Sequence, residues 1–137
     1  MKQYLQNLIN AYEGEIAGEH YFRKLCDVFP KQRGFLMRCA ELENKTAELI
    51  LPLIGKYQLE TKSKLTLQSE GAGYALLDSG KTWPQLIEES INSYPGFVDE
   101  FRALEIMAPN EDRPILEKLT EHELVLIEWM RANKSNN

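Results

Sequence analysis

Four ionisable residues interrupt the apolar faces of predicted helices and could together bind a metal ion: Glu19, Glu43, His122 and Glu123. Apolar residues at helical spacing place Glu19 and Glu43 on inward faces of the first two helices, while His122 and Glu123 flank the apolar line of the last helix. A buried carboxylate is costly unless a cation, a proton or a hydrogen-bond partner compensates its charge. Such converging side chains therefore predict a metal site, and hard carboxylate oxygens favour iron or manganese.

The other acidic and histidine side chains fit simpler roles. Glu15 lies one helical turn before Glu19 and comes near the same face, whereas His20 is expected on the flank of its helix, partly exposed. Five more glutamates are expected on solvated faces: Glu41, Glu48, Glu117, Glu121 and Glu128. A structural role stays open for the four candidates too, because an inward glutamate can belong to a hydrogen-bonded side-chain network.

Helical periodicity predicts the elements that must position these residues. Apolar stripes predict helices over about residues 2–29, 30–57, 82–108 and 110–132, the third of them broken near Pro95. Residues 58–81 lose this periodicity and are predicted to form a long connection that holds one helical turn. The sequence has no alternating pattern typical of β-strands. It therefore predicts one all-α domain over residues 1–137.

The order of these elements resembles the ferritin-like superfamily. Short links make each helix pair antiparallel, and the long link between the pairs crosses along the side of a four-helix bundle. The resemblance covers nearly the whole chain and implies that the four candidate ligands form a core cluster for one or two iron or manganese ions. In the family, such sites serve oxygen activation, iron oxidation or peroxide removal.

The family's metal-binding motifs are degenerate in this chain. Di-iron members carry Glu-x-x-His on two of their helices. Here Thr46 stands three residues after Glu43, and Leu119 stands three residues before His122. A ligand from the third helix is left open among Glu88, Glu89 and Asp99.

The composition is that of one folded domain, with 137 residues, 43% hydrophobic and 27% charged. It excludes a disordered chain, and the net charge of −5 disfavours nucleic acid and anionic membranes as partners. No signal peptide and no apolar run of ~20 residues is predicted. Cys26 and Cys39 are expected as buried free thiols, although a disulfide between them stays open. A cytoplasmic location is the resulting expectation.

Two glycines in the first predicted helix, Gly14 and Gly18, share a face with Ala11. Each glycine in a helix interior costs about 1 kcal/mol relative to alanine. This face is therefore predicted to meet another backbone closely, either within the chain or in a homodimer.

Three functions follow from these observations. The first in rank is a non-catalytic, dimeric interaction or regulatory module with a degenerate metal site, using the face of Gly14 and Gly18. The second is an iron- or manganese-binding protein with oxidase-type or metal-handling activity. The third is a carrier of a small apolar ligand held by the bundle core and residues 58–81. No catalytic residue is assigned, and the sequence leaves open whether the chain is an enzyme.

Overall fold

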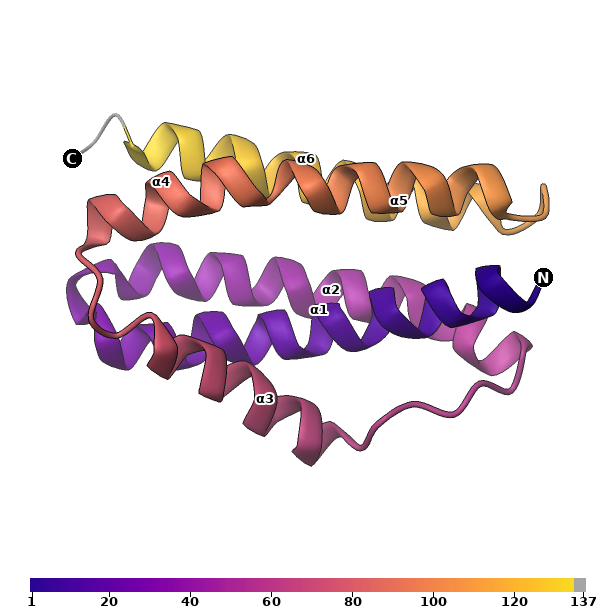
Figure 1. The fold of residues 1–137 in the computed structure, drawn as a ribbon, viewed down its shortest axis with the longest axis horizontal. Helices are drawn as coiled ribbons and strands as arrows, with labels where there is room; N and C mark the ends of the chain where they lie inside the picture. Colours follow the sequence, from indigo (N-terminus) through magenta and orange to yellow (C-terminus); the bar gives the residue numbers. More distant parts are fainter. Residues whose placement is uncertain (135–137) are drawn as a thin grey trace. The chain divides into compact units, whose positions relative to one another are not determined.

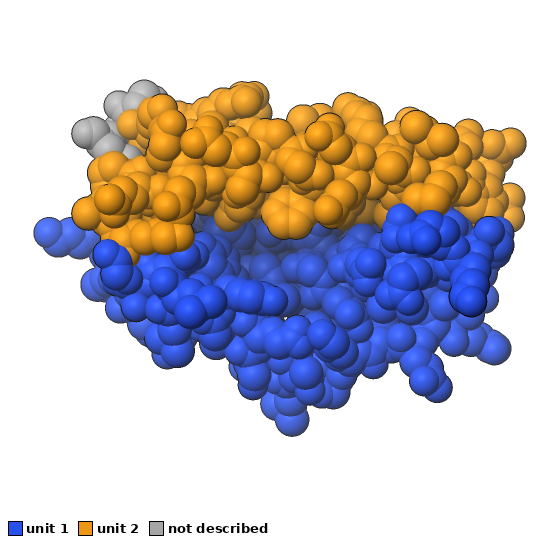
Figure 2. All heavy atoms as spheres, viewed as in Figure 1, with its two compact units in different colours: residues 1–80 blue, residues 81–137 orange. Residues whose placement is uncertain are grey.

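The computed structural model describes residues 1–134, which form six α-helices and one short 3₁₀ helix and contain no β-strand (Figure 1). The predicted all-α class is thus confirmed. The chain divides into two compact units, Met1–Gly80 and Lys81–Asn137, which Figure 2 colours separately. No helix within residues 1–134 is both long enough and apolar enough to cross a membrane.

The first unit is built on a helical hairpin of α1 (Lys2–Val28) and α2 (Arg33–Lys56). Its turn contains the 3₁₀ helix η1 (Pro30–Gln32), where Pro30 suits a first helical position because it has no N–H to satisfy. Buried residues recur every three or four positions along both helices, among them Leu8, Leu25, Leu36 and Ile50. The predicted first two helices are confirmed, except that residues 30–32 form the separate 3₁₀ turn.

A third helix, α3 (Lys64–Leu77), corrects the prediction of a long connection with one helical turn. Ser63 caps it by accepting a hydrogen bond from the Thr66 N–H at 3.1 Å. Its buried stripe consists of Leu67, Gly71 and Ala75, spaced four residues apart. Two of these three residues are small, so the stripe gives little hydrophobic periodicity in the sequence.

The close helix approach occurs between α1 and α3, at Gly71. A Cβ built on Gly71 would collide with the carbonyl oxygen of Ala17 and lie 2.9 Å from the backbone nitrogen of Tyr21. The close contact predicted within the chain at Gly14 is therefore wrong, because a Cβ there would meet nothing within 4 Å, and the homodimer alternative for this face stays a prediction. At Gly18, the neighbour is a side chain of α2, described below.

Two polar contacts tie α3 and its preceding loop to α1. The Tyr21 hydroxyl donates to the Asp78 carboxylate at 2.6 Å, just beyond the end of α3. The Lys62 N–H donates to the Glu13 carboxylate at 2.8 Å, on the loop that leads into the helix. These contacts fix both ends of a helix that buries one large side chain, Leu67, and two small residues.

The second unit packs α4 (Trp83–Ser93) and α5 (Pro95–Met107) along α6 (Arg113–Lys134). Thr82 and Gln85 form a capping box at the start of α4. The predicted break near Pro95 is confirmed, since Pro95 begins α5. The last helix begins at Arg113, three residues later than predicted. The Arg113 side chain donates to the carbonyl oxygens of Glu105 and Ala108, and these bonds close the turn between α5 and α6.

Candidate functional site around Glu19

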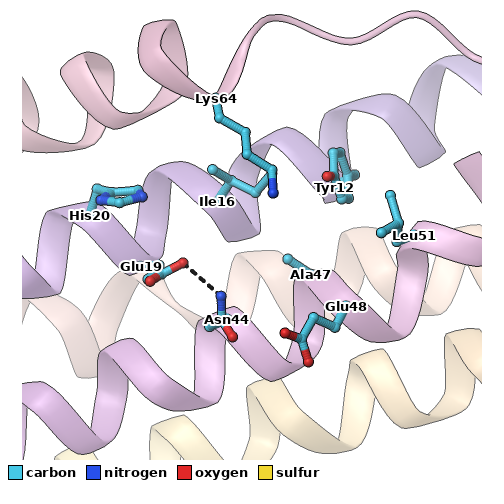
Figure 3. Close-up of a pocket in the computed structure, with 9 residues that line it drawn as sticks. All are labelled: Tyr12, Ile16, Glu19, His20, Asn44, Ala47, Glu48, Leu51 and Lys64. Atoms are coloured by element: carbon cyan, nitrogen blue, oxygen red, sulfur yellow. Dashed lines mark hydrogen bonds between the residues drawn. The ribbon is translucent and has the colours of Figure 1, made fainter.

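A polar cavity of about 170 Å³ lies in the first unit, between α1, α2 and the start of α3 (Figure 3). Its apolar lining comes from Tyr12, Ile16, Ala47 and Leu51, and its polar lining from Glu19, His20, Asn44, Glu48 and Lys64. Figure 3 shows Lys64 reaching from α3 toward Ile16. Tyr12, Ile16 and Glu19 are buried, so part of the lining is fixed in the α1–α2 interface.

Glu19 is buried, and both of its carboxylate oxygens accept hydrogen bonds. Oε2 accepts from Arg23 Nε at 2.7 Å, and Oε1 accepts from Asn44 Nδ2 at 3.1 Å. Arg23 follows Glu19 by one turn on α1, which is the favourable spacing for an ion pair on a helix. The predicted inward position of Glu19 is confirmed, and a cation and an amide compensate its buried charge.

Glu43 lies beside Asn44 on α2 and is half-buried against α1. Its Oε1 lies 3.0 Å from the position that a Cβ would take at Gly18. Gly18 thus makes room for the Glu43 carboxylate within the chain. The α1–α2 interface thus contains the carboxylates of Glu19 and Glu43, the first of which is bound by Arg23.

His122 and Glu123 lie on α6, in the second unit. His122 is half-buried, and its neighbour Glu123 is 7% exposed. Burial raises the pKa of Glu123 from its ordinary 4.5 to about 7, because the charged form loses its hydration. The inward position predicted for Glu123 is confirmed, and this carboxyl is partly protonated at neutral pH.

No group of three or more histidine, cysteine, aspartate or glutamate side chains within residues 1–134 is arranged to hold a metal ion. In this arrangement Glu19 is not available as a metal ligand, because its two carboxylate oxygens accept hydrogen bonds from Arg23 and Asn44. Two of the candidate metal ligands on the predicted third helix form ion pairs with lysines. Glu88 pairs with Lys134, and Glu89 pairs with Lys81. The metal centre predicted from the four candidate residues stays a prediction.

Cys26 and Cys39 are free thiols, and both are buried, as expected from the sequence. Burial raises the pKa of Cys26 and raises that of Cys39 to about 12. Both thiols are therefore kept protonated at neutral pH, which disfavours nucleophilic or metal-binding roles.

The sequence analysis missed Arg23 and Asn44 as members of the site. Arg23 carried a readable signal, since a basic residue four positions after an inward glutamate is a favourable helical pair. Asn44 carried none, because its contact with Glu19 depends on the register between α1 and α2. Lys64 was missed together with the helix that it begins. Comparison with protein-family models, curated proteins and solved structures finds no match to this chain.

Proposed function

We propose that the chain is a non-catalytic helical module that acts by binding to another protein chain, and that the Glu19 network is structural. The observation that carries the structural role of Glu19, and with it the choice against a metal site, is the pairing of both of its oxygens with Arg23 and Asn44. An arginine is positively charged at every physiological pH. Its guanidinium beside Glu19 therefore supplies the positive charge that a metal ion would supply, and opposes the entry of a cation.

The proposal includes a ferritin-like bundle with a degenerate metal site. It is supported by the order of the elements, in which a hairpin of long helices is followed by a linking segment and then by a second set ending in a long helix. The broken third helix of that bundle corresponds to α4 and α5. Two free, buried thiols fit a reducing compartment such as the cytoplasm.

A second candidate function is an iron- or manganese-binding protein. The observation that favours it is the burial of acidic side chains, since Glu15, Glu19 and Glu123 are all buried. Such burial is unusual for glutamate and can accompany a bound cation. In this case, the site would have to release Glu19 from Arg23 before its oxygens could serve as ligands.

Metal content and stability together distinguish these two functions. Protein purified without chelator is analysed for iron, manganese and zinc, as wild type and as Glu19→Ala. We expect no stoichiometric metal in either sample, and a loss of about 1–3 kcal/mol in unfolding free energy for Glu19→Ala, because Arg23 and Asn44 lose their buried partner. Glu48→Ala is the matched control, since Glu48 lines the same cavity but is exposed, and it should change stability little.

Two outcomes would refute the structural role of Glu19. Stoichiometric iron or manganese in the wild type, lost on Glu19→Ala, would identify Glu19 as a metal ligand. A Glu19→Ala variant as stable as Glu48→Ala would show that the hydrogen-bonded network contributes nothing to the fold.

A further inference from the structure

Apart from Leu67, helix α3 buries small residues, and its outer face exposes large apolar ones. Its face toward α1 carries Gly71 and Ala75, whereas Leu65 and Leu77 are 77% and 78% exposed. Leu76 is exposed as well. Single exposed leucines are ordinary on protein surfaces, but three on one short helix leave an apolar surface that the rest of the first unit does not cover. We propose that this outer face of α3 binds the α3 of a second copy of the chain, as an antiparallel homodimer.

The spacing of the exposed residues gives this face a two-fold pattern. Leu65, Ser69, Gly73 and Leu77 are four residues apart and form one ridge along the helix, hereafter the α3 ridge. Its order is large, small, small, large, which is symmetric about position 71. A two-fold interface requires a surface that is complementary to itself. In an antiparallel pair centred at position 71, Leu65 of each copy lies level with Leu77 of the other.

The small residues at the centre of the ridge allow the two helices to come close. Ridges of this four-residue spacing interdigitate when helices cross at about −50°. Leu76 flanks the ridge and adds apolar surface beside the crossing point. Leucines at both ends would then pack over the small residues and exclude water from them.

Gly73 fits this arrangement, and it shares its open Cβ position with the helical glycines Gly14, Gly34, Gly55 and Gly96. Glycine is among the least favourable residues in a helix interior. At Gly71 the reason is the backbone of Ala17, but a Cβ on Gly73 would meet nothing within 4 Å. Close contact with a second α3 would account for a glycine at this position.

Charge and size indicate the strength of the dimer. The α3 ridge and Leu76 carry no charge, so two copies with a net charge of −5 each can meet there without like charges in contact. The ridge and Leu76 comprise five residues, far fewer than the roughly 20–30 residues per partner of a standard interface. We therefore expect a weak, reversible dimer with a Kd of about 10–300 µM.

Sedimentation velocity at loading concentrations from about 5 µM to about 1 mM tests the dimer, because this range brackets the expected Kd. The wild type should move from monomer to dimer across it. Leu77→Glu should raise the Kd at least about tenfold, by placing a charge in the apolar contact. Ile106→Glu is the matched control, since Ile106 on α5 is 82% exposed, and it should leave the Kd unchanged. Far-UV circular dichroism checks that both variants stay helical.

Cross-linking tests the antiparallel geometry. Mild oxidation of a mixture of Leu65→Cys and Leu77→Cys proteins should give disulfide-linked heterodimers, because these positions lie level across the two-fold axis. Leu65→Cys protein alone should give few linked dimers, since its two thiols lie far apart along the helices. The native Cys26 and Cys39 are buried and should not take part.

This inference rests on the proposed function, but the two can fail separately. A wild type that stays monomeric at every concentration overturns the dimer, as does a dimer weakened by Ile106→Glu and not by Leu77→Glu. Linked dimers from Leu65→Cys protein alone would overturn the antiparallel geometry. Stoichiometric metal in the purified protein would refute the non-catalytic module and leave the dimer measurement unchanged.

Discussion

Replacement of Glu123 by glutamine is expected to remove a loss of stability at neutral and alkaline pH. The Glu123 carboxyl is buried, and its pKa is raised from 4.5 to about 7 because burial removes the hydration of the charged form. The folded protein therefore holds this proton more tightly than the unfolded chain does. Glu123 contributes its full stabilisation below the unfolded pKa, and that contribution is lost as the pH rises through the folded pKa.

The size of the effect follows from the shift of the Glu123 pKa. One pKa unit corresponds to about 1.4 kcal/mol, so a shift from 4.5 to about 7 gives a loss of about 3 kcal/mol between acidic and alkaline pH. Most of this loss falls between the two pKa values. Glutamine has the shape of the protonated acid but cannot ionise, so Glu123→Gln should escape the loss.

Urea unfolding, followed by circular dichroism at several pH values, measures this difference. At about pH 5 the wild type and Glu123→Gln should differ by less than about 1 kcal/mol, and at about pH 8 the variant should be more stable by about 3 kcal/mol. Glu121→Gln is the matched control, because Glu121 lies two residues earlier on α6 and is exposed. Its effect on stability should be small at both pH values.

A stability difference between wild type and Glu123→Gln that is the same at both pH values would refute this reasoning. Carboxyl ¹³C chemical shifts give a second readout that does not depend on unfolding. They should show Glu123 titrating near neutral pH in the folded protein. Titration near 4.5 would mean that water or a partner solvates the charged carboxylate.

Two further predictions concern packing and the thiols. Gly71→Ala should lower the unfolding free energy by about 1–3 kcal/mol, because its Cβ would collide with the backbone of α1. Gly14→Ala should instead raise it by about 0.5–1 kcal/mol, because space is open there; thermal unfolding that gives both variants the same sign would contradict this packing. Cys26 and Cys39 should resist iodoacetamide in the folded protein and react in denaturant, as mass spectrometry can show; fast labelling of the folded protein would mean that they are accessible.

Long apolar stripes made most of the helices predictable from the sequence. The stripes of α1 and α2 contain large side chains such as Leu8 and Ile50, and proline marked both the turn before α2 and the start of α5. Helix α3 could not be predicted in the same way. Its buried contact with α1 uses Gly71 and Ala75, and small residues give almost no hydrophobic signal, although they allow the closest packing.

The candidate site was predictable in its acidic residues and not in their partners. The inward position of Glu19 followed from the helical period of α1. Arg23 lay within the same helix and could have been paired with it from spacing alone. Asn44 could not, because its position opposite Glu19 is set by the packing of two helices, which no local pattern in the sequence records.

Among the described residues, the energetic cost of burying a charged carboxylate is reduced in different ways at Glu19 and at Glu123. Glu19 stays close to a guanidinium and an amide, whereas Glu123 retains a proton to a higher pH. A metal ion is a third way to compensate a buried carboxylate, and all three give the same inward acidic residue in the sequence. An acidic residue on an apolar stripe therefore predicts compensation but not its kind. What separates the cases is the neighbouring side chain, and Arg23 beside Glu19 is the reason that we favour a binding module over a metalloprotein.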